Sequence, residues 1–236
     1  MSSRSIIGCQ PHHPEKRLII TIDGPAGVGK STVAKRLALR LGYRYADTGA
    51  LYRAVAWKVS MSGIDPSDHH AVAQLLSNTS LILGQDPKAP RISVDGKDVT
   101  DEIRTAEISQ LASIVSALPA VREWLIPIQR RMGMGGGVVV EGRDIGTRIF
   151  PAADMKFFLE ADQTVRATRR HHELASAGET MALDQIRLEI ENRDTRDRSR
   201  PISPLVPAPD ATIIDTTSLG VEQVVDRMMN VVASKL

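Results

Sequence analysis

Residues 24–31 of the chain are Gly24-Pro25-Ala26-Gly27-Val28-Gly29-Lys30-Ser31. Two glycines five positions apart, followed by Lys and Ser, are typical of a loop that binds nucleotide phosphate. Glycine lets backbone N–H groups turn toward anionic oxygens, and a helix that begins at the loop adds partial positive charge. We therefore expect Lys30 to reach the β and γ phosphates of ATP and the Ser31 hydroxyl to be a ligand of Mg²⁺.

The segments on either side of this loop support that prediction. Residues 18–23 are a short β-branched run, which is typical of a buried parallel strand. Residues 31–41 have apolar side chains on one helical face, and Gly42 is expected to end the helix. A glycine-rich turn without a ligand is the alternative, and the order of strand, loop and helix argues against it.

The rest of the chain alternates strands with helices. Further strands are expected at 43–46, 138–140, 155–159 and 211–215, which favours an α/β fold with a five-stranded, doubly wound parallel sheet flanked by helices. Residues 63–104 break this alternation, because Asp95 and Gly96 between two short alternating runs predict a hairpin. We interpret 63–104 as a small inserted antiparallel β subdomain, and the Arg-rich segment 178–204 as a lid.

Size, charge and cysteine content exclude several classes of protein. The 236 residues, 42% of them hydrophobic, suit one domain over 17–236. A net charge of +2 gives no field that would favour a nucleic acid or membrane partner, and no stretch has the ~20 apolar residues of a membrane span. Residues 1–16 are predicted to be a disordered leader without the apolar core of a secretory signal. Together with the single cysteine, this predicts a cytoplasmic protein.

The remaining motifs narrow the type of phosphate chemistry. A GTPase needs an Asn-Lys-x-Asp motif and a transporter-type ATPase needs Leu-Ser-Gly-Gly, and the sequence has neither. Arg53 and Arg143 follow predicted strands, where ligands bind in open α/β sheets. Because an acceptor that is already a phosphate brings its own nucleophile, it requires charge neutralisation instead of a general base. The arginines therefore favour a small kinase whose acceptor is a phosphate.

The charged run 193–200 has two interpretations. On a solvated helix it would form two i, i+4 ion pairs, Asp194 with Arg198 and Arg193 with Asp197. Arg196 and Arg200 would be left without a partner in that arrangement. We therefore favour a lid that grips an anion.

Four motifs together resemble those of a known family. They are 24–31, Asp47-Thr48-Gly49-Ala50-Leu51-Tyr52-Arg53, Gly142-Arg143-Asp144-Ile145-Gly146-Thr147, and Arg193-Asp194-x-x-Asp197-x-x-Arg200. From residue 18 to its C-terminus the chain resembles the bacterial cytidylate kinases, which are nucleoside monophosphate kinases of the P-loop class. The resemblance implies ATP-dependent phosphorylation of CMP and dCMP to CDP and dCDP in pyrimidine nucleotide metabolism, with Mg²⁺. We expect a monomer that binds these small molecules only.

The motifs and the resemblance assign roles to individual residues. The ATP side is expected to comprise Gly24, Gly27, Gly29, Lys30, Ser31, Thr32 and Arg169. The resemblance implies that the cytosine is read by Ser113, Arg122 and Asp144, with Arg200 also near the nucleotide, and that the ribose is held by Arg193 and Asp197. It places Thr48, Tyr52, Arg53, Arg143 and Arg200 around the acceptor phosphate. The residues expected to act in catalysis are Lys30, Arg143, Arg193 and Arg200.

Some alternatives stay open from the sequence. Ser113 belongs to a stripe with Ser109 and Ser116 that would also suit the exposed side of a helix. Glu141 stands where the family more often has Asp, so its part in positioning Mg²⁺ or water is open. Another monophosphate kinase, for UMP or a different base, and a regulatory module without turnover are the remaining functional alternatives.

Overall fold

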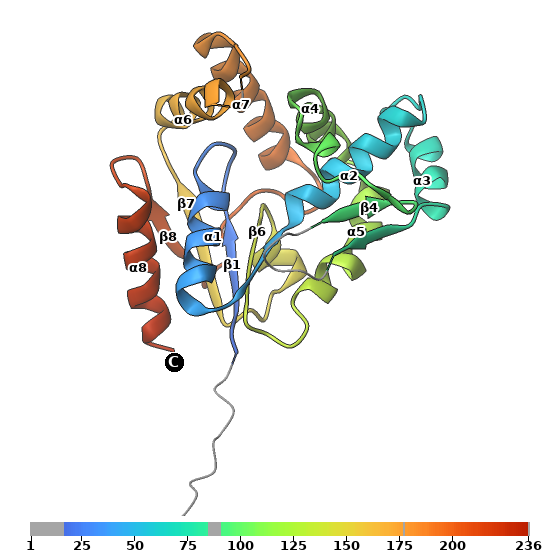
Figure 1. The fold of residues 1–236 in the computed structure, drawn as a ribbon. Helices are drawn as coiled ribbons and strands as arrows, with labels where there is room; N and C mark the ends of the chain where they lie inside the picture. Colours follow the sequence, from blue (N-terminus) through green and yellow to red (C-terminus); the bar gives the residue numbers. More distant parts are fainter. Residues whose placement is uncertain (1–16, 85–90, 177, 236) are drawn as a thin grey trace, which may run out of the picture.

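The computed structural model describes residues 17–84, 91–176 and 178–235 (Figure 1). The predicted leader, 1–16, lies outside the described residues. The main sheet has five parallel strands in the order β2-β6-β1-β7-β8. These strands are β1 (Ile19–Asp23), β2 (Arg44–Asp47), β6 (Val138–Gly142), β7 (Met155–Glu160) and β8 (Thr212–Asp215). The predicted five-stranded parallel sheet is confirmed.

Helices cover both faces of this sheet. On one face, α1 (Lys30–Leu41) packs beside α8 (Val221–Ala233), and both share an apolar core with β1 and β7. The other face is covered by side chains from α5 (Pro119–Met132) and from a single π-helical turn, Ile145–Ile149. Gly42 ends α1 in a left-handed conformation at φ 65°, as predicted.

A second sheet and its helices form the substrate-side unit. Its strands β3 (Leu81–Leu83), β4 (Ile92–Val94) and β5 (Lys97–Asp98) are antiparallel. Asp95 and Gly96 both have positive φ, 51° and 81°, as a tight hairpin turn requires. The predicted inserted sheet is confirmed, and its core is shared with helices α2 (Thr48–Met61), α3 (His69–Ser77), α4 (Ala106–Val115) and α5, and with the 3-10 turn Glu102–Arg104.

Two helices stand over the carboxyl ends of the main strands. Figure 1 shows α6 (Gln163–Ser176) and α7 (Leu183–Ser199) side by side at the top of the molecule. They bury a small apolar cluster of their own, made of Ala167, Leu174, Ile186 and Ile190. The segment predicted as a lid, 178–204, contains α7, whereas α6 precedes it. We refer to α6 and α7 together as the lid.

No single helix within 17–84, 91–176 and 178–235 is long and apolar enough to cross a membrane; the pair α4 and α5 passes on length and composition together, bent by 103°.

Candidate active site

One cleft of about 910 Å³ lies between the phosphate loop, the substrate-side unit and the lid. It gathers nearly all the predicted site residues from segments that are far apart in the sequence. Those that line it are Gly27, Gly29, Lys30, Ser31, Thr32, Thr48, Tyr52, Arg53, Ser113, Arg122, Arg143, Asp144, Arg169, Arg193, Asp197 and Arg200. Only Gly24 among the predicted residues is not part of the lining.

The glycines of the phosphate loop have different structural roles. A Cβ on Gly24 would lie 2.4 Å from the carbonyl oxygen of Leu159, and one on Gly27 would lie 2.9 Å from that of Arg166. These two glycines therefore allow the loop to pass closely against β7 and α6. Gly29 precedes α1 at φ 92° and has open space where a Cβ would be.

Lys30 is buried at the first turn of α1. Its Nζ donates a 2.6 Å hydrogen bond to the carbonyl oxygen of Pro25, so the side chain folds back across the loop. Burial, assisted by the nearby charge of Arg143, holds the pKa of Lys30 well below its usual range. An ammonium group in such surroundings gains more from an anionic ligand than an exposed lysine would.

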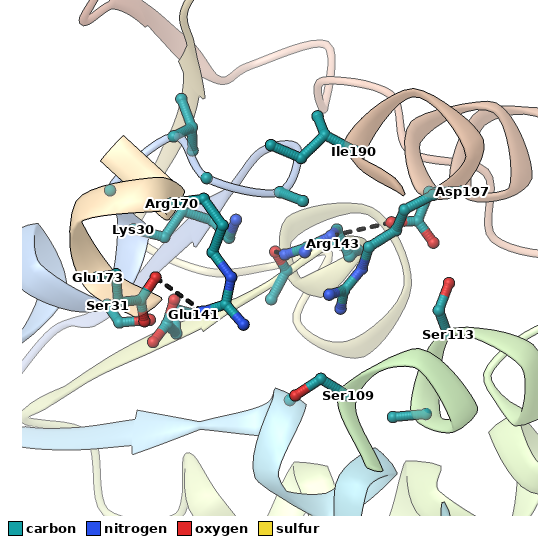
Figure 2. Close-up of a pocket in the computed structure, with 18 of the residues that line it drawn as sticks. Lys30, Ser31, Ser109, Ser113, Glu141, Arg143, Arg170, Glu173, Ile190 and Asp197 are labelled. Carbon is teal, nitrogen blue, oxygen red and sulfur yellow. Dashed lines mark hydrogen bonds and ion pairs between the residues drawn. The ribbon is translucent and has the colours of Figure 1, made fainter. Parts of the chain in front are cut away.

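Side-chain oxygen atoms lie close together beside the start of α1. The Tyr45 hydroxyl donates to Glu141, and Figure 2 shows the Glu141 carboxylate beside Ser31. Burial, together with the charge of Asp47, raises the pKa of Glu141. An oxygen-only donor set suits Mg²⁺. Within the described part of the chain, no three His, Cys, Asp or Glu side chains are grouped to hold a metal. The residues present therefore fit an ion that arrives with a nucleotide.

The opposite wall of the cleft carries arginines from several segments. Arg53 on α2 pairs with Asp47 at 2.7 Å. Asp47 also accepts a hydrogen bond from the backbone N–H of Ala50 and so caps α2. Asp197 accepts a 3.0 Å hydrogen bond from Nε of Arg143, and its other oxygen lies 3.6 Å from Arg200 (Figure 2 shows the Arg143 contact). Asp197 therefore holds two arginines at the same place.

Several guanidinium nitrogens on this wall have no acceptor. Nε of Arg193 and both Nε and Nη2 of Arg200 are buried without a hydrogen-bond partner among the described residues. Burial, followed by repulsion from Arg143, lowers the pKa of Arg193 to about 10. A buried donor without an acceptor costs free energy, which an anion bound here would recover. These nitrogens are the clearest sign of an acceptor that carries negative charge.

A buried polar group closes the far end of the cleft. Arg122 forms an ion pair with Asp144 and donates to the carbonyl oxygen of Ser116 at 3.0 Å. Ser113 is 3% exposed, and its Oγ has no hydrogen-bond partner in the described structure. Figure 2 shows its hydroxyl directed from α4 into the cleft. The interpretation of the hydroxyl stripe as the exposed side of a helix is wrong at Ser113 and Ser116, since both are buried.

The solvated interpretation of the run 193–200 is also wrong. Asp194 pairs with Arg166 of α6 at 2.6 Å instead of with Arg198, and both side chains are buried. Asp197 hydrogen-bonds Arg143 from outside the helix. Tertiary partners thus replace the pairs that helical spacing alone would suggest.

Two residues of the site were missed by the sequence analysis. Asp23, at the end of β1, is buried and accepts hydrogen bonds from the backbone N–H groups of Ile145 (2.9 Å) and Gly146 (2.8 Å). Burial raises the pKa of Asp23 to about 6. Arg170 lines the cleft and pairs with Glu173 at 2.8 Å (Figure 2). The position of Arg170 next to Arg169 was a usable signal, whereas nothing in the sequence near Asp23 indicated its role.

Comparison with known proteins assigns the family. The family model described as cytidylate kinase matches residues 20–234. The chain belongs to the cytidylate kinase family. It is 46% identical to the cytidylate kinase of Geobacillus kaustophilus over 222 residues, which cover 94% of this chain and 99% of that one. It is 50% identical to the cytidylate kinase of Pelotomaculum thermopropionicum over 207 residues, 87% of this chain and 92% of that one.

Solved structures resemble the chain in fold alone. An uncharacterized protein from Eubacterium ventriosum superimposes with a TM-score of 0.50 at 14% identity, and the match covers 93% of this chain and 99% of that one. The predicted family is confirmed by sequence, and the predicted fold by the sheets described above.

Proposed function

We propose that ATP on the phosphate loop donates its γ-phosphoryl group to CMP or dCMP held on the arginine-bearing wall, which gives CDP or dCDP. Membership of the cytidylate kinase family makes the chain a phosphotransferase. The buried, unpartnered guanidinium nitrogens of Arg193 and Arg200 carry the assignment of the acceptor site. They lie across the cleft from a loop whose sequence is typical of phosphate binding.

The donor side is built mostly from backbone. The N–H groups at Gly27 and Gly29 and the start of α1 would surround the phosphates of ATP. Lys30 would exchange the Pro25 carbonyl for phosphate oxygens, and Thr32 lies at the same helix start. Ser31 would hold Mg²⁺ with Glu141 behind it, and the ion would neutralise charge on the β and γ oxygens.

Arg169 would border the rest of the ATP molecule. It donates to the backbone carbonyl oxygen of Thr216 at 2.6 Å and to its Oγ1 at 3.0 Å. These bonds hold the guanidinium group of Arg169, which extends from α6 of the lid, in the wall of the cleft. We propose that the guanidinium plane packs against the ATP nucleoside.

The acceptor side supplies charge neutralisation. An oxygen of the CMP phosphate is already anionic, so it attacks the γ-phosphorus without a protein general base; the new O–P bond forms while the bond to the β-phosphate oxygen breaks, and ADP leaves. Two anions must approach each other for this step. The side chains that would offset their repulsion are Thr48, Tyr52, Arg53, Arg143, Arg193 and Arg200.

The far end of the cleft would read the base. The exocyclic amino group of cytosine is a donor, which suits the Asp144 carboxylate, and its ring acceptors suit Arg122 and Ser113. Uracil has a carbonyl where cytosine has this amino group, and that oxygen would face a carboxylate. Arg193 and Asp197 would hold the ribose.

A panel of monophosphates tests the proposal. The purified chain is assayed with ATP and Mg²⁺ for ADP release in the presence of CMP, dCMP, UMP, AMP or GMP. We expect CMP and dCMP to be the best acceptors, and we expect a chelator to abolish turnover until Mg²⁺ is restored in excess. A preference for UMP or a purine would indicate another monophosphate kinase, and no turnover at all would indicate a regulatory module. The cytoplasmic location and the monomeric state remain predictions.

A further inference from the structure

The lid binds both backbone polar groups of one phosphate-loop residue, Ala26. Arg166 Nη1 of α6 donates a 3.0 Å hydrogen bond to the carbonyl oxygen of Ala26, and Asp194 Oδ1 of α7 accepts from the Ala26 N–H at 3.4 Å. Asp194 and Arg166 are themselves joined at 2.6 Å, and their side chains are only 12% and 8% exposed. Both backbone polar groups of one loop residue are thus bound by one ion pair from the two lid helices.

This arrangement is not explained by stability alone. A buried ion pair costs desolvation that its mutual attraction often fails to recover. This pair in addition provides partners for the N–H and the carbonyl oxygen of Ala26, which apolar residues of similar size would leave unsatisfied. Asp194 also forgoes the solvated pair with Arg198 that helical spacing offers. The ion pair between Asp194 and Arg166 instead makes a contact that is specific for the backbone of the phosphate loop.

The position of Asp194 on α7 connects this contact to the acceptor site. Its neighbour Arg193 and, one turn later, Asp197 both line the cleft. Asp197 in turn holds Arg143 and Arg200. A change in the conformation of the loop at Ala26 would therefore move the whole acceptor-side group through one rigid helix.

We propose that Asp194, with Arg166, is a positioning residue that couples ATP binding on the phosphate loop to CMP binding under the lid. The inference rests on the proposed function and adds the route by which the two substrates favour each other's binding. ATP orders the loop, the loop fixes Ala26, and the ion pair sets α7 at the distance at which its arginines reach the acceptor phosphate. The reverse must also hold, because coupling between two binding sites is reciprocal.

The test compares the full-length wild type with Asp194→Asn by isothermal titration calorimetry. The asparagine keeps the size and an acceptor for the Ala26 N–H but loses the charge that binds Arg166. CMP affinity is measured with and without an ATP analogue whose β,γ bridge is an imido group. In the wild type the analogue should tighten CMP binding at least about fivefold, and in Asp194→Asn this factor should fall to about one. The affinity for CMP alone should change by less than about twofold, which a general loss of structure would not allow.

A matched variant on the same helix serves as the control. Glu191→Gln makes the same carboxylate-to-amide change on α7, but Glu191 is exposed and lies outside the cleft lining. It should retain the wild-type coupling factor. Asp194→Glu should recover part of the coupling lost in Asp194→Asn, and Arg166→Lys probes the same contact from α6 if Asp194→Asn lowers the melting temperature.

Three results would overturn the inference. The first is an absence of coupling between ATP analogue and CMP in the wild type. The second is full coupling in both Asp194→Asn and Arg166→Lys, and the third is a parallel loss of both substrate affinities in all variants of the pair. Turnover of CMP by the wild type tests the proposed function separately. A wild-type enzyme that turns over CMP while the variants keep full coupling contradicts only the role of Asp194.

Discussion

The two walls of the cleft are built in opposite ways. Most of the donor wall comes from one continuous segment, residues 26–32, which presents backbone N–H groups together with Lys30, and Arg169 of α6 adds to it. The acceptor wall collects Arg53 from α2, Arg143 from the end of β6, and Arg193 and Arg200 from the end of α7. Every polar group that we assign to binding on the acceptor wall is a side chain.

This difference separates general binding from specific binding. A loop of backbone donors recognises phosphate regardless of what the phosphate is attached to. Side chains brought together by tertiary structure can distinguish one base and one acceptor, because each can be placed against a particular atom. In the proposed function, the donor wall accounts for the binding of ATP, and the acceptor wall accounts for the choice of acceptor.

The largest expected effect comes from the donor wall. Lys30→Met keeps the buried stem and removes the charge, so kcat should fall by about 10³-fold, or about 4 kcal/mol of transition-state stabilisation. Steady-state assays of ADP release measure this loss, with circular dichroism to show that the fold is retained. A variant with near-normal kcat would show that Lys30 does not contact the transferred group.

The next effect distinguishes the two walls. Arg143→Ala should lower kcat by about 10²-fold and raise the KM for CMP more than that for ATP. Arg143→Lys should recover little, because an ammonium cannot reproduce the bond from Nε to Asp197 together with a phosphate contact. A larger rise in the KM for ATP would place Arg143 on the donor wall and contradict the division described here.

Asp23 connects the segments that carry the two walls, and the effect of its protonation on stability provides a third prediction. The end of β1 leads into the phosphate loop, while the Asp23 carboxylate holds the backbone that follows Asp144. Its pKa is raised to about 6 by burial, so the folded chain binds more protons than the unfolded chain between about pH 4 and about pH 6. The stabilisation that protonated Asp23 gives the folded chain is therefore present at low pH and is lost as the pH rises through about 6.

Urea unfolding of the wild type and of Asp23→Asn at several pH values measures this contribution of Asp23 to stability. The difference in free energy of unfolding, wild type minus variant, should rise by about 2 kcal/mol in favour of the wild type as the pH is lowered from 7 to 4. Groups that titrate equally in both proteins cancel in the difference. A difference that is flat with pH, or that shifts the other way, would contradict the assignment.

The smallest expected effect tests the selectivity of the acceptor wall. Ser113→Ala and Asp144→Asn should each reduce the preference for CMP over UMP by about tenfold, or about 1.4 kcal/mol, in kcat/KM ratios. The KM for ATP should stay unchanged, because both side chains lie at the far end of the cleft. A uniform loss across all acceptors would instead mark these residues as structural.

The contrast between the walls also explains what could be predicted from the sequence. The conformations of the phosphate loop and of the turn at Asp95 and Gly96 depend on neighbours within a few residues, so local rules were sufficient to predict them. The run 193–200 did not follow local rules. Asp194 had an i, i+4 partner in sequence, but a buried arginine 28 residues away binds it instead.

The role of Asp23 could not be predicted for the same reason. Its hydrogen-bond partners lie more than 120 residues later in the chain, and they become available only because β1 pairs with β6. The roles proposed for Ser113 and Asp144 come from the resemblance to the family. Residue patterns alone left Ser113 on a stripe of hydroxyl groups, and only the fold shows that Ser113 and Ser116 are buried.

A crystal structure of the chain with CMP, Mg²⁺ and an imido analogue of ATP tests the central claim most directly. We predict the analogue on the phosphate loop and the CMP phosphate among Arg53, Arg143 and Arg200, with an oxygen of that phosphate about 3 to 3.5 Å from the γ-phosphorus. The cytosine should lie against Asp144. CMP bound elsewhere, or bound in this cleft with its phosphate directed away from these arginines, would contradict the account.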